Sequence, residues 1–359
     1  MKLDDLQQKT ADWRATIALN QRRTVFVIAL FMGLYLFLGL LLDSIYYSHA
    51  VIAGPQGYQY LVPSVPAAFV ALITLQLTPF FTLIAVAIAV ISLFVTYSMY
   101  DRLMLMGTDY REVLPDTADP IARQLYNVVE EMKVASGMAY MPKVYIIEAD
   151  YMNAFASGYS ERSAMVAITR GLIQKLDRDE LQAVMAHELS HIRHQDIKLT
   201  LTASVLSNLL LMMVEILYFN VLFGGGRSRN DERGNGAGAA LFLVVLVLRF
   251  VLPLVTLLLT LYLSRTREYM ADAGAVELMR TNEPMARALL KIHQDHQQHA
   301  ETVTSEYAAS GHEEIRRAAY IYDPVQAGVA PKTCLTSYFS THPNITDRLR
   351  ALGFSIADS

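Results

Sequence analysis

Hydrophobic residues gather in four long blocks that polar segments separate. The blocks occupy 24–42, 80–97, 199–223 and 239–263. A helix that crosses a bilayer needs about 20 predominantly apolar residues, and each block approaches or exceeds that length. The pattern therefore predicts about four transmembrane helices. The apolar stretch 66–77 is shorter and is bounded by prolines, so we interpret it as an interfacial or re-entrant segment.

Basic residues predict the orientation of these helices. Five Lys or Arg residues precede the first block, and none lies between that block and Arg102. Because cytoplasmic loops carry an excess of Lys and Arg, the segment 1–23 is expected in the cytoplasm, the loop 43–79 outside, and the chain from Arg102 inside again. Three arginines in the linker 224–238 would also favour the cytoplasm. Whether the hairpin 199–263 spans the bilayer fully is therefore left open.

The polar remainder of the chain is long enough for one domain with its own core. Hydrophobic periodicity within it predicts helices at 122–136 and 178–194 and strands at 143–148 and 163–169. Asp177 precedes the second helix and Glu180 follows three residues later, as in a capping box. We therefore expect an α+β domain that is mainly helical and contains a small β-sheet.

The predicted domain organisation follows from these blocks. It consists of a cytoplasmic segment at 1–23, two N-terminal transmembrane helices with an external loop at 24–100, a soluble domain at 101–198 and 264–359, and an inserted hydrophobic helical hairpin at 199–263.

The helix predicted at 178–194 carries the sequence HELSH. His187 and His191 are four residues apart, so they share one helical face and can hold a single zinc ion. Glu188 lies beside the first histidine, where it can act as a base on a metal-bound water. A surface helix with two solvated histidines would show the same spacing.

A catalytic zinc of this kind needs a third protein ligand. The candidate is Glu268, in the polar stretch SRTREYMAD that directly follows the fourth apolar block. Asp272 is one turn further on the same helical face and can accept the other ring N–H of a zinc-bound histidine. The alternative is a juxtamembrane helix whose charged residues only face solvent.

Two charges lie inside the third and fourth apolar blocks. Glu215 and Arg249 fall at similar depth in a hairpin that closes between the blocks. Because unpaired charges inside a membrane are costly, we predict that these two side chains form an interhelical pair. The alternative is that each one reaches polar surroundings separately.

Composition narrows the class of protein. The chain of 359 residues is 53% hydrophobic and 18% charged, with a net charge of −4. Soluble domains have about 25% charged residues, so this chain is expected to be a membrane protein with a soluble part. A near-neutral charge argues against nucleic-acid binding. The single cysteine, Cys334, excludes an intrachain disulfide framework.

The remaining histidines are expected to lie outside the metal site. His194 follows the motif closely, but the two motif histidines and Glu268 already complete a ligand set. His293, His296 and His299 alternate with polar residues and are predicted to form a solvated helix face.

Taken together, HELSH, SRTREYMAD, the upstream NAFA and the downstream THP resemble the HtpX-type family of membrane zinc endopeptidases, which are related to the CAAX prenyl proteases. The resemblance covers nearly the whole chain. It implies a zincin-type metalloprotease fold with one zinc ion per chain on His187, His191 and Glu268. It also implies that Glu188 is the general base.

The same resemblance assigns residues to substrate binding. It implies that an edge strand pairs with the extended substrate backbone, a recurring mode of peptide recognition. The residues concerned are Asn153, Ala154, Phe155 and Ala156. It further implies that His342 and Arg348 stabilise the oxyanion or position the substrate. Arg348 has an alternative role, in which it pairs with Asp347 or Asp272.

The expected function is that of an integral-membrane zinc-dependent endopeptidase that hydrolyses peptide bonds with a zinc-activated water. The family implies a multi-pass protein of the bacterial inner membrane with a cytoplasmic catalytic domain, whose substrates are misfolded membrane proteins removed in quality control and stress response. The expected partners are protein or peptide substrates and the lipid bilayer, without nucleic acid. Two alternatives stay open: a narrow-specificity processing protease, and a non-catalytic client-binding membrane adaptor. The sequence also leaves open whether 301–331 forms a lid.

Overall fold

The computed structural model describes residues 6–8, 13–48, 51–53, 59–61, 64–158, 160–224, 235–309, 316, 319–327 and 342–356. The chain divides into two compact units. We call 1–24, 96–200 and 261–359 the sheet unit, and 25–95 and 201–260 the helical unit. Within the 301–331 region considered as a lid, residues 310–315, 317–318 and 328–331 lie outside the described residues.

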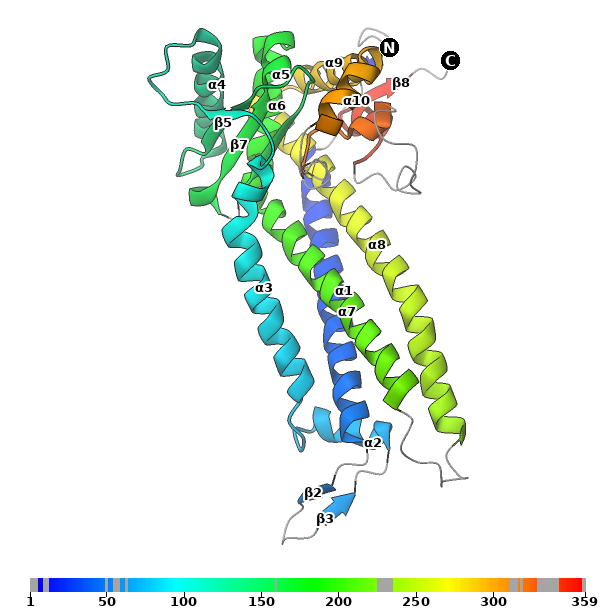
Figure 1. Ribbon diagram of the computed structural model, residues 1–359. Coiled ribbons are helices and arrows are strands. Elements are labelled where there is room, and N and C mark those ends of the chain that lie inside the picture. The colour runs from blue at the N-terminus through cyan, green and yellow to red at the C-terminus, as the bar shows by residue number, and fades with distance from the viewer. Residues whose placement is uncertain are drawn as a thin grey trace. The chain divides into compact units, whose positions relative to one another are not determined.

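Long helices dominate the helical unit, and four of them continue into the sheet unit (Figure 1). These four are α1 (Trp13–Tyr47), α3 (Phe80–Leu105), α7 (Asp196–Gly224) and α8 (Asn235–Met279). The short helix α2 (Val65–Ile73) precedes α3. Strands β2 (Val51–Ala53) and β3 (Gln59–Leu61) pair with each other in antiparallel fashion.

Two of the described helices contain apolar runs long enough to cross a membrane. They are Ala29–Tyr47 in α1 and an apolar window within Phe242–Met279 of α8. The apolar runs of the other two long helices, Phe80–Thr96 and Ala203–Phe219, are shorter. Two of the predicted spans thus satisfy the criteria of length and composition, and the count of four stays a prediction. The proline-bounded stretch that we interpreted as interfacial overlaps α2, whose nine residues are too few to cross a bilayer.

A buried carboxylate joins α1 to the start of α3. Asp43 is fully buried and accepts the backbone N–H of Phe81 at 2.7 Å and that of Thr82 at 2.9 Å. The Thr82 hydroxyl donates to the same carboxylate at 2.7 Å. The first N–H groups of a helix have no partner within the helix, so Asp43 caps α3 from another helix. Gly39 permits this approach because a Cβ there would lie 2.8 Å from Thr82 Oγ1.

Replacing Asp43 with alanine is expected to lower the free energy of unfolding by about 1–3 kcal/mol, because several buried donors lose their acceptor. Asp43→Asn keeps one acceptor oxygen and should fall between the alanine variant and the wild type. Thermal unfolding of the three proteins in the same detergent would test this order. Equal unfolding temperatures for wild type and Asp43→Ala would contradict the capping role.

The predicted pair between Glu215 and Arg249 is confirmed in the helical unit. Arg249 Nε lies 3.0 Å from Glu215 Oε1. The Arg249 guanidinium also lies 4.1 Å from the ring centroid of Tyr218, in a cation–π arrangement. The pair joins α7 to α8, so each charge has a partner within the protein.

A small mixed sheet organises the sheet unit, and the predicted α+β class is confirmed. Its strand order is β4 (Tyr110–Glu112), β5 (Lys143–Ile147), β7 (Met165–Thr169) and β6 (Ala154–Ser157). β5 and β7 are parallel and the other pairs are antiparallel. β1 (Leu6–Gln8) and β8 (Phe354–Ile356) form a separate antiparallel pair.

Helices surround this sheet (Figure 1). They are α4 (Pro120–Ser136), α5 (Arg170–Lys175), α6 (Arg178–His194), α9 (Glu283–Gln298), α10 (Ala300–Ala309) and α12 (Ile345–Ala351). Two 3₁₀ turns occur at Glu161–Ser163 and Pro324–Ala327. The helix predicted at 178–194 coincides with α6, and the capping box between Asp177 and Glu180 is present.

The prediction of a solvated histidine face on α9 is wrong for His296. This side chain is fully buried, and burial lowers its pKa to about 4. Its Nδ1 lies 2.9 Å from the Ile292 carbonyl oxygen. His293 is half-buried and His299 is exposed, so the three side chains do not form one solvated face.

Candidate active site

Helices α6 and α8 meet closely at the HELSH motif. A Cβ on Gly274 of α8 would lie 2.4 Å from Ser190 Oγ of α6, so a larger residue would push the helices apart. The Ser190 hydroxyl donates a hydrogen bond to the Ala186 carbonyl oxygen at 2.7 Å. Through this contact the part of α8 that carries Glu268 lies beside the motif histidines. The role of Gly274 depends on its contact with α6, a segment distant in the chain, so the sequence does not reveal it.

Three donor groups converge at this junction. His187 Nε2 and His191 Nε2 are 3.2 Å apart. Glu268 Oε2 lies 3.6 Å from His187 Nε2, and Glu268 Oε1 lies 3.8 Å from His191 Nε2. All three residues are buried, with at most 3% exposed. They form the one group of potential metal donors found in the part of the chain that the structure describes.

The spacing of these donors fits a tetrahedral metal ion. Nitrogen and oxygen ligands at about 2.0–2.1 Å from zinc in tetrahedral geometry are about 3.4 Å from one another. The observed separations of 3.2, 3.6 and 3.8 Å bracket that value. Three protein donors leave a fourth position, the arrangement of catalytic rather than structural zinc sites.

Each histidine of the group has a carboxylate at its other ring nitrogen. His187 Nδ1 lies 3.0 Å from Asp272 Oδ1, and His191 Nδ1 lies 2.8 Å from Asp196 Oδ2. A carboxylate at Nδ1 holds the ring so that the Nε2 lone pair faces the centre of the site. The contact of Asp272 is the one predicted from the sequence.

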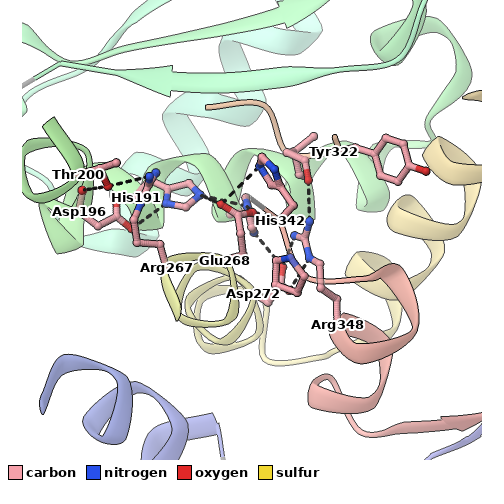
Figure 2. Close-up of polar contacts among 12 residues, drawn as sticks. His191, Asp196, Thr200, Arg267, Glu268, Asp272, Tyr322, His342 and Arg348 are labelled. Carbon is pink, nitrogen blue, oxygen red and sulfur yellow. Dashed lines mark hydrogen bonds and ion pairs between the residues drawn. The ribbon is translucent and has the colours of Figure 1, made fainter. Parts of the chain in front are cut away.

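Sequence reasoning missed Asp196, which begins α7 just after the motif helix. It is buried, and Arg267 approaches it with Nε 3.6 Å from Asp196 Oδ1. Arg267 Nη1 also donates to Thr200 Oγ1 at 2.8 Å (Figure 2). The available signal was a carboxylate five residues after His191, and the structure adds that Gln195, in the left-handed region, ends α6 between them.

Asp196→Asn is expected to weaken divalent-metal binding by about 10- to 100-fold, the range for loss of a group that orients a ligand. Competition between the protein and a zinc chelator would measure the change. Asp347→Asn is the matched control, because Asp347 is exposed and pairs with Arg350 on the surface. An unchanged zinc affinity in Asp196→Asn would contradict the orienting role.

Glu188 lies next to the donor group with unusual surroundings. Its side chain is fully buried, and neither carboxylate oxygen has a hydrogen-bond partner among the residues that the structure describes. Burial raises the pKa of Glu188, although His187 and His191 oppose this rise. Buried polar atoms usually have partners, so these oxygens are free to interact with water or substrate.

The charges around the site favour a cation at its centre. Burial lowers the pKa of His187, but the carboxylates of Asp272 and Glu268 outweigh burial and raise that pKa to about 9. Burial raises the pKa of Glu268, yet His342, His187 and other positive groups bring it well below its usual value. The donor group therefore concentrates negative charge, which a proton or a divalent cation would balance.

Arg348 makes the contact that the sequence left as an alternative. Its Nε and Nη2 donate to the two oxygens of Asp272 at 2.8 and 2.6 Å (Figure 2). Burial lowers the pKa of Arg348, but Asp272 and Glu268 more than compensate and raise it. Asp347, the other candidate partner, pairs with Arg350. Arg348 thus binds both oxygens of the carboxylate that lies beside His187 Nδ1.

The other predicted substrate-binding residues also lie near the donor group or on β6. His342 Nε2 is 3.9 Å from Glu268 Oε1. Asn153 directly precedes β6, the edge strand of the sheet, and Ala154–Ser157 form that strand. His194 is not among the donor groups.

The chain belongs to peptidase family M48, whose family model matches residues 121–354. It is similar to the "Protease HtpX homolog" of Helicobacter pylori (strain Shi470), with 39% identity over 341 residues that cover 94% of this chain and 96% of that protein. The "Protease HtpX homolog" of Limosilactobacillus fermentum is 34% identical over 337 residues, covering 94% of this chain and 97% of that protein. The chain is an HtpX-type M48 protease, as the motifs predicted.

Among solved structures, the crystal structure of S. mikatae Ste24p is similar, with a TM-score of 0.48 and 19% sequence identity. The similarity covers 78% of this chain and 60% of that chain.

Proposed function

We propose that the protein is a zinc-dependent endopeptidase. The observation that carries this proposal is the convergence of His187, His191 and Glu268 beside the unpartnered carboxylate of Glu188. The three donors would hold one zinc ion per chain. When bound, zinc lowers the pKa of a water molecule and polarises the carbonyl group of a substrate.

Glu188 would act as the general base and then as the acid. Its carboxylate takes a proton from the attacking water and returns it to the amine that leaves. The raised pKa of the buried carboxyl suits this exchange, since a proton carrier works best when its pKa approaches the working pH. Asp272 and Asp196 keep both motif histidines oriented during the cycle.

His342 would assist at the oxygen of the scissile carbonyl. Its ring lies beside Glu268 and is fully buried, so a hydrogen bond from it would act in a region with little water. Arg348 would serve as a positioning residue, because its guanidinium is engaged by Asp272.

We further propose that the protein is an integral, multi-pass protein of a bacterial inner membrane with its peptidase domain in the cytoplasm. The two apolar helices of sufficient length and the distribution of basic residues support this placement. Substrates would be misfolded membrane proteins, in keeping with candidate zinc ligands that lie on either side of the apolar blocks 199–223 and 239–263 in the sequence.

Metal removal and reloading test the activity directly. Purified wild type stripped with a chelator is expected to lose cleavage of an unfolded membrane protein, and stoichiometric zinc is expected to restore it. Cleavage that persists after complete metal removal would contradict the proposal. Zinc binding without cleavage of several unfolded proteins would instead favour a narrow-specificity protease or a client-binding adaptor.

A further inference from the structure

A segment of the chain itself lies along the strand expected to bind substrate. Phe155 of β6 forms an antiparallel bridge with Tyr320, and the Ile321 N–H donates to the Ala154 carbonyl oxygen at 2.9 Å. We call residues 319–323 the inner segment. It runs in the direction that an extended peptide would take if it paired antiparallel with β6.

The register of the sheet shows that this contact uses the free edge of β6. The Thr169 N–H donates to the Asn153 carbonyl oxygen, so Asn153 directs its backbone toward β7. Backbone groups alternate in direction along an antiparallel strand, and Ala154 and Ala156 therefore direct theirs away from β7. The inner segment occupies the Ala154 carbonyl, a group that a substrate backbone paired with this edge would also need. This cover explains why an edge strand is buried along its whole length.

The three polar residues assigned to substrate by the family resemblance all contact the backbone of the inner segment. Asn153 Nδ2 donates to the Tyr322 carbonyl at 3.0 Å, and the Tyr322 N–H donates to Asn153 Oδ1 at 3.4 Å. Arg348 Nη1 donates to the Ile321 carbonyl at 2.6 Å. The His342 ring hydrogen-bonds the Tyr320 carbonyl.

These contacts lie directly beside the donor group. The Arg348 nitrogen that holds Ile321 is 3.7 Å from Glu268 Oε2. Figure 2 shows Tyr322, His342 and Arg348 together with Glu268. An extended peptide that paired with β6 near the metal would thus need the same carbonyl and side-chain groups that the inner segment already uses.

Side chains anchor the inner segment in place. Tyr320 is 1% exposed and packs edge-on against Phe155 with a centroid separation of 5.8 Å. The Tyr322 hydroxyl lies 2.5 Å from His293 Nδ1. Release of the segment therefore has a free-energy cost, which would lower the activity of the resting protein.

We propose that the inner segment is an internal pseudosubstrate that occupies the peptide-binding edge and must leave it before cleavage. This inference rests on the proposed endopeptidase function. Substrate and inner segment then exclude each other, and the resting protein is largely latent.

Hydrogen exchange on the zinc-loaded wild type tests this exclusion. A peptide hydroxamate, which combines an extended backbone with a zinc-chelating group, is the probe. At saturation the Ile321 and Tyr322 amides are expected to lose protection, whereas the Thr169 amide, which pairs within the sheet, keeps it. Unchanged or increased protection at Ile321 and Tyr322 with the probe bound would overturn the proposal. Failure of the hydroxamate to bind would count against the endopeptidase function itself.

A matched pair of variants gives a second test. Ile321→Pro and Ile321→Ala both remove the branched side chain, but only proline removes the N–H that pairs with Ala154. Relative to Ile321→Ala, Ile321→Pro is expected to raise kcat/KM for an unfolded substrate about fivefold, the factor that corresponds to one lost hydrogen bond of about 1 kcal/mol, mainly through a lower KM. Equal or lower kcat/KM in the proline variant, with equal zinc content, would contradict the proposal. If the proline variant does not fold, the exchange experiment on wild type decides.

Discussion

Glu188→Gln is expected to reduce cleavage of an unfolded substrate by about 10²- to 10⁴-fold, the usual contribution of a general base. Zinc should stay bound, because Glu188 does not belong to the donor group formed by the two histidines and Glu268. Glutamine keeps the shape of the buried side chain but cannot take a proton from water. Parallel measurements of kcat/KM and of zinc per chain on wild type and variant would establish both points.

The control for this substitution is Glu277→Gln. Glu277 lies in α8, outside the donor group, and pairs with Arg193 at the surface. The same change from carboxylate to amide there should leave cleavage and zinc content at wild-type levels. A Glu188→Gln protein that cleaves at the wild-type rate would refute the assigned mechanism.

Glu268→Gln is expected to remove zinc as well as activity. Loss of an orienting group weakens metal binding about 10- to 100-fold. Loss of a direct ligand should weaken zinc binding by more than that. The amide is neutral, so the negative charge that balances the metal also falls. Competition with a zinc chelator would measure the affinity, and unfolding of the metal-free proteins would show that the variant still folds.

The two substitutions separate the roles of the two glutamates. Glu188→Gln should bind zinc without cleaving, whereas Glu268→Gln should do neither at zinc concentrations that saturate the wild type. Wild-type zinc affinity in Glu268→Gln would show that a different group supplies the third ligand. Glu277→Gln serves again as the control, since it lies on the same helix as Glu268.

The sequence by itself determined the parts of the site that depend on local geometry. A spacing of four residues places His187 and His191 on one helical face wherever the helix lies, and the capping box marks the start of that helix. The same rule places Glu268 and Asp272, four residues apart, on one face of α8. The charged pair of Glu215 and Arg249 was also predictable, because an unpaired charge inside a long apolar helix is costly.

Only the tertiary structure decided the contacts between segments that are distant in the chain. Asp43 caps α3 from another helix, and His296 is buried by packing around α9. The sequence offered Asp347 and Asp272 as acidic partners for Arg348. Its pairing with Asp272 depends on how α12 lies against α8. The inner segment reaches β6 across more than a hundred residues. Such contacts have no periodicity along the sequence, since their energy comes from burial and hydrogen bonding between surfaces that exist only after the chain has folded.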